Sequence, residues 1–309
     1  MKILVKTGKL SREEWLKWRT KGIGGSDVSI IAGINKFKSS FQLWLEKTGQ
    51  IVPQEEESEY AHFGSVLEPI VKKEFTRVTG LKIRNKKMIL QSEEYPFMLA
   101  DLDGVITENG EMCIFEAKTA SAYKQDVWEE GVPMEYILQV QHYMAVTGAK
   151  KAYVAALVGG NHFYYHEVLR DETLIGQIIE MEKEFWEESV LLRMEPVADG
   201  SEATTDYLNE RYGTTNGEVV ELPEEALGLC DSFERLTEQL KALKEQKDSV
   251  ANQLKNYLKE NEVGTVGNRV VKWKQISTTT FDRARLEKEN KAVYDEYCTK
   301  SQYRRLSVA

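Results

Sequence analysis

Two neighbouring apolar segments of this chain carry charged residues at positions where a β-strand is normally buried. The segment PFMLADLDGVIT contains Asp101 and Asp103, and the segment EMCIFEAKT contains Glu116 and Lys118. Short apolar runs separated by a turn signal such as Asn-Gly predict paired strands. A charge inside a half-buried strand is costly unless it meets an opposite charge or a metal ion. The chain must therefore fold so that these charges meet.

The spacing of these charges indicates hydrolysis of a phosphodiester. Side chains alternate between the two faces of a strand, so Glu116 and Lys118 share one face while Ala117 points to the core. Asp103 can lie opposite them. Two carboxylates and a backbone carbonyl are hard oxygen ligands suited to Mg²⁺ or Mn²⁺, and a nearby ammonium can orient or help to deprotonate an attacking water.

The pattern alone leaves two alternatives open. An acid next to a lysine is also common as a surface ion pair. Asp101 shares a face with Asp103 and competes with it as the acidic ligand. Gly104 follows Asp103 and allows close approach of the backbone, which favours Asp103.

Charge is distributed unevenly along the chain. Its 309 residues include 41 Lys and Arg against 50 Asp and Glu, a net charge of −9, which argues against a protein that binds nucleic acid over its whole surface. The first fifty residues nevertheless hold ten basic and four acidic residues, a local balance of +6. A local patch of this kind can still attract phosphate groups.

The sequence also predicts a cytosolic protein without a cysteine metal site. No apolar stretch approaches the roughly 20 residues of a membrane span, and lysines interrupt the apolar residues of MKILVKTGKL, so no signal peptide is expected. Cys113, Cys230 and Cys298 are too far apart for zinc or iron–sulfur spacing. His162 and His166 share a strand face merely because of its period of two.

Helical and strand patterns are interspersed. After Ser11 and Glu14, which fit a capping box, a helix leads into the loop GIGGSD, where Ser26 or Asp27 can cap a short helix. Helices are also expected at residues 41–49, 63–80, 133–148 and 171–192, and strands at 86–92, 96–107, 111–119, 152–160 and 163–170. The first three of these strands predict an antiparallel meander, and the whole predicts an α+β fold.

The composition predicts a first domain at 1–200, a linker at 201–222 and a second module at 223–309. In this module, positions 229, 233, 236, 240, 243, 247, 250, 254 and 257 alternate steps of four and three, and all but Lys247 are apolar. Such a heptad seam predicts a helical hairpin or coiled coil, with helix packed on helix. A strand pair, GTVGNRVVKWKQ, and the basic tail KSQYRRLSVA complete the module.

Five motifs occur in a specific order. They are W-R-x(4)-G-G-S-D from Trp18 to Asp27, G-x-x-L-E from Gly64 to Glu68, L-D-G from Leu102 to Gly104, E-A-K from Glu116 to Lys118, and Q-V-Q-H-Y from Gln139 to Tyr143. With these motifs the chain resembles the YqaJ-like viral recombinase family, phage-type exonucleases of the same group as lambda exonuclease, within the PD-(D/E)XK nuclease superfamily. The resemblance covers residues 12 to 190 and implies a central mixed sheet flanked by helices.

Carried over by position, the resemblance implies roles for the charged residues. Asp103 and Glu116 would bind the metals with the carbonyl of Ala117, and Lys118 would act on the nucleophilic water. Glu68 would assist a second metal or position that water, and Gln139 would line the same site. On sequence alone, Glu68 could equally be an exposed helical residue, and Gln139 a polar residue on a solvent face.

The resemblance also implies that Arg19 and Ser26 hold a terminal 5′-phosphate. The chemistry is reasonable, because an arginine fork binds a phosphate in two places and a glycine-rich turn that opens a helix presents N–H groups and a hydroxyl. The alternative is a capped helix beside a surface arginine. Lys21, Lys36 and Lys38 lie among aromatic residues and are the expected contacts to DNA phosphates.

The function implied by the resemblance is a Mg²⁺-dependent 5′-to-3′ exonuclease that resects double-stranded DNA ends to 3′ single strands for phage-type recombination. It also implies a RecT-like single-strand annealing partner, a ring-shaped homo-oligomer with a trimer as the expected size, and action in the cytoplasm of a bacterial host. One alternative is an endonuclease or single-strand-specific nuclease, since the same D…E-x-K core serves many substrates. Another is a non-catalytic interaction protein that uses the heptad helix.

Overall fold

The computed structural model describes residues 1–52, 59–299 and 303–308. It divides into two compact units, Met1–Leu208 and Asn209–Ala309. Residues 300–302 and 309 of the expected basic tail lie outside the described part. Within the described residues, no helix is both long and apolar enough to cross a membrane.

Local capping interactions fix the first helices of the N-terminal unit. In α1 (Arg12–Arg19), the Ser11 hydroxyl accepts a hydrogen bond from the Glu14 amide and the Glu14 carboxylate accepts one from the Ser11 amide, which confirms the capping box. Helix α2 (Gly25–Ile31) begins earlier than expected, because Asp27 caps it from inside the first turn by accepting from the Gly24 amide. Next come α3 (Ser40–Lys47) and α4 (Glu59–Thr79).

The strands of this unit form two sheets. One is four-stranded, in the order β1-β4-β5-β2, and the other is five-stranded, in the order β3-β6-β7-β8-β9, with only β7 and β8 parallel in the second. The strands are β1 (Lys2–Lys6), β2 (Ile23–Gly24), β3 (Ile83–Arg84), β4 (Met88–Gln91), β5 (Met98–Asp101), β6 (Gly104–Glu108), β7 (Glu111–Ala120), β8 (Lys151–Val158) and β9 (His162–Leu169).

The strand expected at residues 96–107 is divided between the two sheets, which corrects the simple antiparallel meander. Its first half, β5, pairs with β4 in one sheet, and its second half, β6, pairs with β3 and β7 in the other. Leu102 and Asp103 cross from sheet to sheet. Gly104 permits this crossing, because a Cβ atom there would lie only 2.4 Å from a side-chain carbon of Ile83. Asp103 therefore lies at the junction of the sheets rather than inside a strand.

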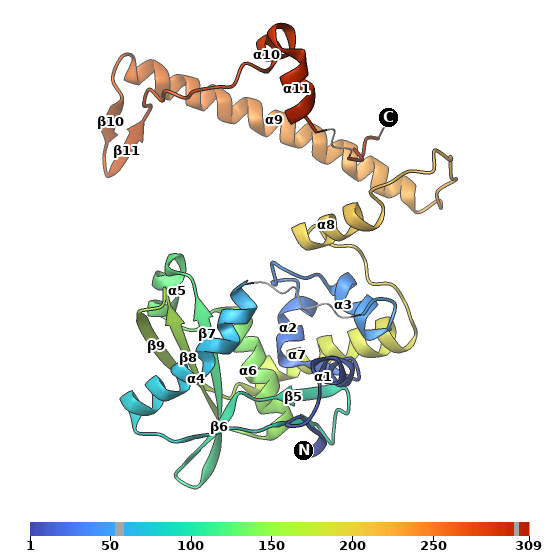
Figure 1. Ribbon diagram of the computed structural model, residues 1–309, viewed down its shortest axis with the longest axis vertical. Coiled ribbons are helices and arrows are strands. Elements are labelled where there is room, and N and C mark those ends of the chain that lie inside the picture. Colours follow the sequence, from blue (N-terminus) through green and yellow to red (C-terminus); the bar gives the residue numbers. More distant parts are fainter. Residues whose placement is uncertain (53–58, 300–302, 309) are drawn as a thin grey trace. The chain divides into compact units, whose positions relative to one another are not determined.

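Helices cover both faces of the five-stranded sheet, as the α+β expectation required (Figure 1). Strand β8 shows the alternation, since Ala152, Val154, Ala156 and Val158 belong to the larger core and Tyr153 and Ala155 to the smaller one. The larger core includes α6 (Met134–Thr147) and α7 (Glu172–Glu184), the latter continued by a π-helical turn at Phe185–Leu191. The smaller core includes α4, whose Phe75 ring centroid lies 4.9 Å from that of Phe115. A short helical turn, Ala122–Lys124, and α5 (Gln125–Glu130) follow β7.

Part of the segment expected as a linker is helical. Residues Glu202–Arg211 form α8, and Asp199 supports its start by accepting hydrogen bonds from the hydroxyls of Ser201 and Thr204. The ring of Tyr207 in α8 packs edge-on against Phe41 of α3. These contacts extend the first unit beyond residue 200.

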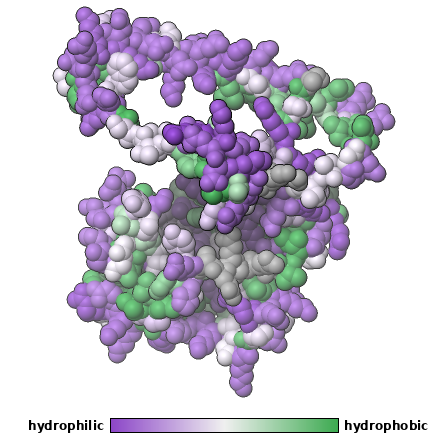
Figure 2. Space-filling model, turned by 45° about the horizontal axis from the view of Figure 1, so that its top comes forward, coloured by the Kyte–Doolittle hydropathy of each residue, from purple (hydrophilic) through white to green (hydrophobic). Residues whose placement is uncertain are grey.

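The C-terminal unit is built on the long helix α9 (Ala226–Leu258), and the expected strand pair is the hairpin β10 (Val263–Val266) and β11 (Arg269–Lys272). Two short helices follow, α10 (Arg283–Glu289) and α11 (Lys291–Tyr297). The apolar seam residues of α9, from Leu229 to Tyr257, are between 40% and 84% exposed, and apolar side chains appear among hydrophilic ones on the molecular surface (Figure 2). The predicted packing of helix on helix therefore stays a prediction.

A buried polar pair joins three elements of the N-terminal unit. His142 of α6 and Glu182 of α7 are fully buried and lie 2.7 Å apart, while the other ring nitrogen of His142 contacts the carbonyl oxygen of Leu99 in β5 at 2.8 Å. This pair fixes α6 against β5, the strand that leads into Asp103.

Replacing Glu182 by Ala should lower the free energy of unfolding by about 3–5 kcal/mol, because one partner of a buried pair is removed. The control is Glu180→Ala, an exposed position on the same helix, which should change the free energy by less than about 0.5 kcal/mol. Urea unfolding followed by circular dichroism measures both. Equal, small effects of the two substitutions would contradict the structural role of the pair.

Candidate active site

The face of β7 that carries Glu116 and Lys118 meets α6. The Lys118 ammonium donates hydrogen bonds to Glu116 Oε1 at 2.8 Å and to Gln139 Oε1 at 2.9 Å, and Gln139 Nε2 donates to the same Glu116 oxygen at 2.7 Å. Glu116 is only 3% exposed. The three side chains that the sequence predicted to share a site thus form one hydrogen-bonded cluster.

Asp103 joins this cluster from the crossing between the sheets. Its Oδ2 accepts a hydrogen bond from the amide of Ala117 at 2.8 Å, between Glu116 and Lys118 on β7. The pKa of Asp103 is raised to about 8, mainly by burial and secondly by the negative charge of Glu116. The positive charge of Lys118 opposes this shift. Two acidic groups held this close disfavour each other's ionisation, and Lys118 offsets this effect only in part.

Lys118 is held as an ammonium. Burial alone would lower the pKa of Lys118, but the carboxylates of Glu116 and Asp103 outweigh burial and raise it. Its Nζ also lies 4.7 Å from the centre of the Tyr136 ring, a cation–π contact. Lys118 therefore brings a fixed positive charge and N–H donors to the carboxylates.

Glu68 reaches the site from α4 and is tied to it by Lys72, one helical turn further on. Lys72 forms an ion pair with Glu68 and donates to the backbone carbonyl of Asp103 at 2.6 Å and to the side-chain oxygen of Asn85 at 3.1 Å. The Glu68 side chain remains 36% exposed. It lies at the rim of the site rather than in its buried floor.

The glycine-rich turn forms a second polar corner. Arg19 Nη2 donates to the hydroxyl of Ser26 at 2.6 Å, at the start of α2. Gly25 is needed there, because a Cβ atom would lie 2.5 Å from the ring of Tyr143 on α6. Tyr143 in turn accepts a hydrogen bond from Gln139 Nε2 at 3.1 Å, so one side chain connects this corner to the carboxylate cluster.

Trp15 holds the arginines of α1 and gives Asp101 a separate role. The guanidinium groups of Arg12 and Arg19 lie 4.1 Å and 4.9 Å from the centre of its indole ring. The indole N–H donates to Asp101 Oδ2 at 2.7 Å. Asp101, the competing aspartate, therefore anchors Trp15.

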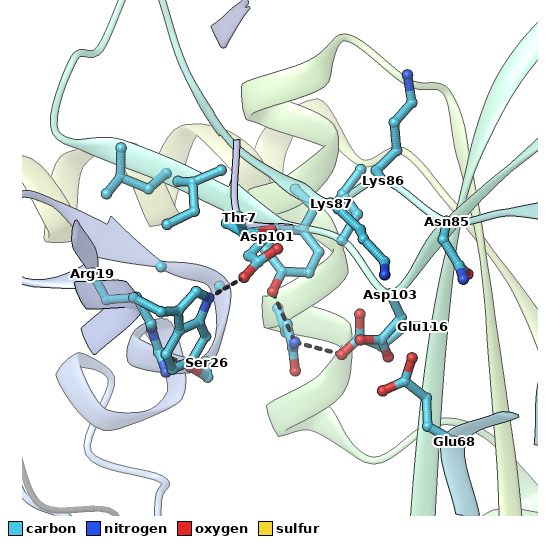
Figure 3. A pocket seen from close by; sticks show the side chains of 18 of the residues that line it. Thr7, Arg19, Ser26, Glu68, Asn85, Lys86, Lys87, Asp101, Asp103 and Glu116 are labelled. Atoms are coloured by element: carbon cyan, nitrogen blue, oxygen red, sulfur yellow. Dashed lines mark hydrogen bonds between the residues drawn. The ribbon is translucent and has the colours of Figure 1, made fainter. Parts of the chain in front are cut away.

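One cavity of about 400 Å³ contains both polar groups (Figure 3). Arg19 and Ser26 lie at one end, Asp103, Glu116 and Glu68 lie towards the other, and Asp101 lies between them. A second cavity of about 290 Å³ shares the same three carboxylates and is also lined by Ala117 and Lys118. The carboxylates thus lie where two cavities meet.

The three lysines expected to contact DNA do not line these cavities. The Lys21 ammonium nitrogen lies 3.6 Å from the centre of the Trp18 ring. Lys36 is exposed, and Lys38 forms an ion pair with Glu46. The cavity instead contains basic residues that the sequence reasoning missed: Arg12, Lys72, Lys86 and Lys87. The signal for the last two was the basic run KIRNKK directly before β4.

The donor set fits a divalent cation. Glu116 Oε2 is buried and has no hydrogen-bond partner, which leaves one carboxylate oxygen to be satisfied. Within the described ranges, no group of three or more His, Cys, Asp or Glu side chains is arranged so that it could hold a metal ion by itself. Mg²⁺ binds in this incomplete manner, through one or two carboxylates with water and substrate phosphate as its other ligands.

Comparison with known proteins gives consistent matches. The family model described as the YqaJ-like viral recombinase domain matches residues 14–150. Over 310 residues, covering 99% of this chain and 97% of the relative, the chain is 43% identical to a Bacillus subtilis (strain 168) protein described as uncharacterized protein YqaJ. Two crystal structures of LHK-Exo, an alkaline exonuclease from Laribacter hongkongensis, share the fold, each with a TM-score of 0.50 over 65% of this chain and 98% of theirs. The protein in the complex with dAMP is 22% identical in sequence to this chain, and the protein in the other structure is 20% identical.

A buried ion pair supports the glycine-rich corner from below. Asp27 Oδ2 accepts from the Lys47 ammonium at 2.7 Å, and this ammonium also donates to the carbonyls of Arg19 and Gly22. Burial alone would raise the pKa of Asp27, but Lys47 and Arg19 outweigh it and hold the pKa below the ordinary value. Asp27 is therefore a structural anion in the folded chain.

Asp27→Asn should lower the free energy of unfolding at pH 7 by about 3–5 kcal/mol, because Lys47 loses its buried partner. Since the pKa of Asp27 is lower in the folded state than in the unfolded state, its contribution is present above pH 4 or so and declines as the pH falls further. The difference in free energy of unfolding between wild type and variant should therefore narrow by about 1 kcal/mol as the pH falls from 6 to 3.

Urea unfolding at several pH values measures this gap. The control is Asp126→Asn, an exposed position, which should differ from wild type by less than about 0.5 kcal/mol throughout. A gap for Asp27→Asn that stays constant down to pH 3 would contradict the ion-pair account.

Proposed function

Because the chain belongs to the YqaJ-like viral recombinase family, we propose that it is a divalent-metal-dependent exonuclease that degrades double-stranded DNA from its 5′ ends. The observation that carries the proposal is the shared cavity of about 400 Å³. It joins an arginine–serine corner suited to a terminal phosphate with a partly buried carboxylate cluster suited to hydrolysis. The name of LHK-Exo, an alkaline exonuclease with the same fold, agrees with this assignment.

Asp103 and Glu116 are the proposed metal ligands, with the Ala117 carbonyl beside them and Glu68 at the rim. When bound, Mg²⁺, or Mn²⁺ in its place, would supply a Lewis acid that polarises the scissile phosphate and lowers the pKa of a bound water. The unpartnered Glu116 Oε2 and the raised pKa of Asp103 support this role, because both indicate carboxylates that lack a cation.

Lys118 and Gln139 are proposed to position the attacking water and to orient Glu116. Both side chains donate to the same oxygen of Glu116, which leaves its second oxygen directed away from them. The fixed ammonium of Lys118 also favours the extra negative charge that develops on phosphate oxygens during attack.

Arg19 and Ser26 are proposed to bind the terminal 5′-phosphate. The guanidinium is held in place by Trp15 and Ser26, and the hydroxyl lies in the first turn of α2, where backbone N–H groups favour an anion. An enzyme that holds the end in this way would release nucleotides from that end one after another.

The family assignment also supports the wider proposal of end resection for recombination. In that proposal the 3′ single strands pass to a RecT-like annealing protein, and the exonuclease works in the bacterial cytoplasm as a ring-shaped homo-oligomer, with a trimer as the expected size. Closure around DNA would explain processive action by a chain whose net charge is −9. The exposed seam of α9 is one surface available for a partner.

Lys118→Ala should reduce hydrolysis of linear duplex DNA with Mg²⁺ by at least about 100-fold, because the water and Glu116 lose their orienting ammonium. Lys124→Ala removes an exposed lysine near the end of β7 and should leave the rate unchanged. Release of acid-soluble nucleotide measures the rate. Full activity of Lys118→Ala would overturn the assignment of the site.

Arg19→Ala should raise the activation free energy for degradation of 5′-phosphorylated duplexes by about 2–3 kcal/mol, because a charge-assisted contact is lost. This change slows degradation roughly 30- to 160-fold. The same variant should differ much less from wild type on 5′-hydroxyl ends, which lack that phosphate. Lys17→Ala, an exposed position on the same helix, is the control. Equal activity of wild type and Arg19→Ala on phosphorylated ends, or cutting of closed circles by wild type, would favour an endonuclease.

A further inference from the structure

Two short connections carry the chain from one sheet to the other at adjacent places. One crossing is Leu102–Asp103, between β5 and β6, and the other is residues 85–87, between β3 and β4. The pairing brings them side by side, since Ile89 lies opposite Asp101 in one sheet and Arg84 lies opposite Val105 in the other. The short connection 85–87 must therefore run alongside Asp103.

Contacts at both ends hold the crossing at residues 85–87 in place. Lys72 donates both to the Asp103 carbonyl and to Asn85 Oδ1, and thus ties one crossing to the other. On the other side, the Thr7 amide donates to the Lys87 carbonyl at 2.9 Å. The side-chain stem of Lys87 lies over Gly8, 3.5 Å from where a Cβ atom of that glycine would be. The connection is anchored at both ends.

Lys86 and Lys87 of this connection both line the cavity, and in Figure 3 the Lys87 side chain points towards Asp103 while the Lys86 side chain extends away from the carboxylates. Neither has an ion-pair or hydrogen-bonding partner for its ammonium among the described residues. The other basic residues of the cavity have assigned contacts, Lys72 with Glu68 and Arg19 with Ser26. Two unpaired ammonium groups on one connection, lining the same cavity as the carboxylates, indicate a place for an anion.

We propose that Lys86 and Lys87 bind backbone phosphates of the strand being cut, on the 3′ side of the scissile bond. This inference rests on the proposed function. If the terminal phosphate lies at Arg19 and the scissile phosphate lies at Asp103, the following linkages continue away from Arg19, towards the side of the cavity where Figure 3 shows Asn85 and Lys86, with Lys87 nearer the middle. Contacts to phosphate carry no sequence information, which suits an enzyme that must advance along any DNA.

The test measures salt dependence of binding without cleavage. A fluorescent 5′-phosphorylated duplex is titrated with the full-length protein in EDTA, and affinity is followed by anisotropy at several salt concentrations. Each phosphate contact contributes about 0.9 to the slope of log affinity against log salt concentration. Lys86→Gln with Lys87→Gln should reduce that slope by about 1–2.

The matched control is Lys73→Gln with Lys82→Gln, which removes the same charge from two exposed lysines nearby that do not line the cavity. This control should keep the wild-type slope. An equal slope for both double variants, whether reduced or not, would overturn the inference while leaving the proposed function intact. A wild-type protein that neither binds nor shortens duplex DNA would instead overturn the proposed function, and the inference with it.

A neutral methylphosphonate linkage locates the contact. Placed at the first or second linkage 3′ of the scissile bond, it should weaken binding of wild type by about tenfold, the effect of losing roughly 1.4 kcal/mol. The same neutral linkage should have little effect on binding by the variant with Lys86→Gln and Lys87→Gln, which has already lost this contact. Equal weakening of both proteins at these positions would show that other residues hold these phosphates.

Discussion

The neighbouring carboxylates of half-buried Asp103 and buried Glu116 are the constraint on which the rest of the N-terminal unit depends. Burying two like charges together is unfavourable unless cations and hydrogen bonds compensate them. The chain supplies the Ala117 amide for Asp103, and Lys118 and Gln139 for Glu116, but leaves Glu116 Oε2 without a partner. The unfinished compensation is what makes the cluster suitable for a divalent cation and a phosphate.

The two sheets provide the geometry that this cluster needs. A continuous strand would put Asp103 in a ladder, whereas the crossing at Leu102–Asp103 frees its side chain to meet β7 from the junction of the sheets. The close packing of Gly104 against Ile83 makes the crossing possible. Lys72 links this crossing to the one at residues 85–87, because it donates hydrogen bonds to Asp103 and to Asn85. From the other direction, α6 brings Gln139 to the carboxylates and Tyr143 to the glycine-rich turn. The same framework thus serves both ends of the cavity.

Local patterns predicted the parts of the site that lie within single elements. The period of two in β7 put Glu116 and Lys118 on one face, and the capping box fixed the start of α1. The division of the strand at Leu102 was not predictable, because its apolar run continues through the crossing and only pairing with other strands divides it. The cavity lysines were missed for a related reason, since the sheet pairing, and not sequence spacing, brings the connection that carries Lys86 and Lys87 alongside Asp103.

The central claim is that end recognition and hydrolysis share one cavity. A crystal structure of the Lys118→Ala variant with Mg²⁺ and a 5′-phosphorylated duplex tests it most directly. The account predicts the terminal phosphate within about 3 Å of Arg19 and Ser26, and the next phosphate at Asp103 and Glu116. A duplex bound with its 5′ end away from Arg19, or with no phosphate at the carboxylates, would contradict it.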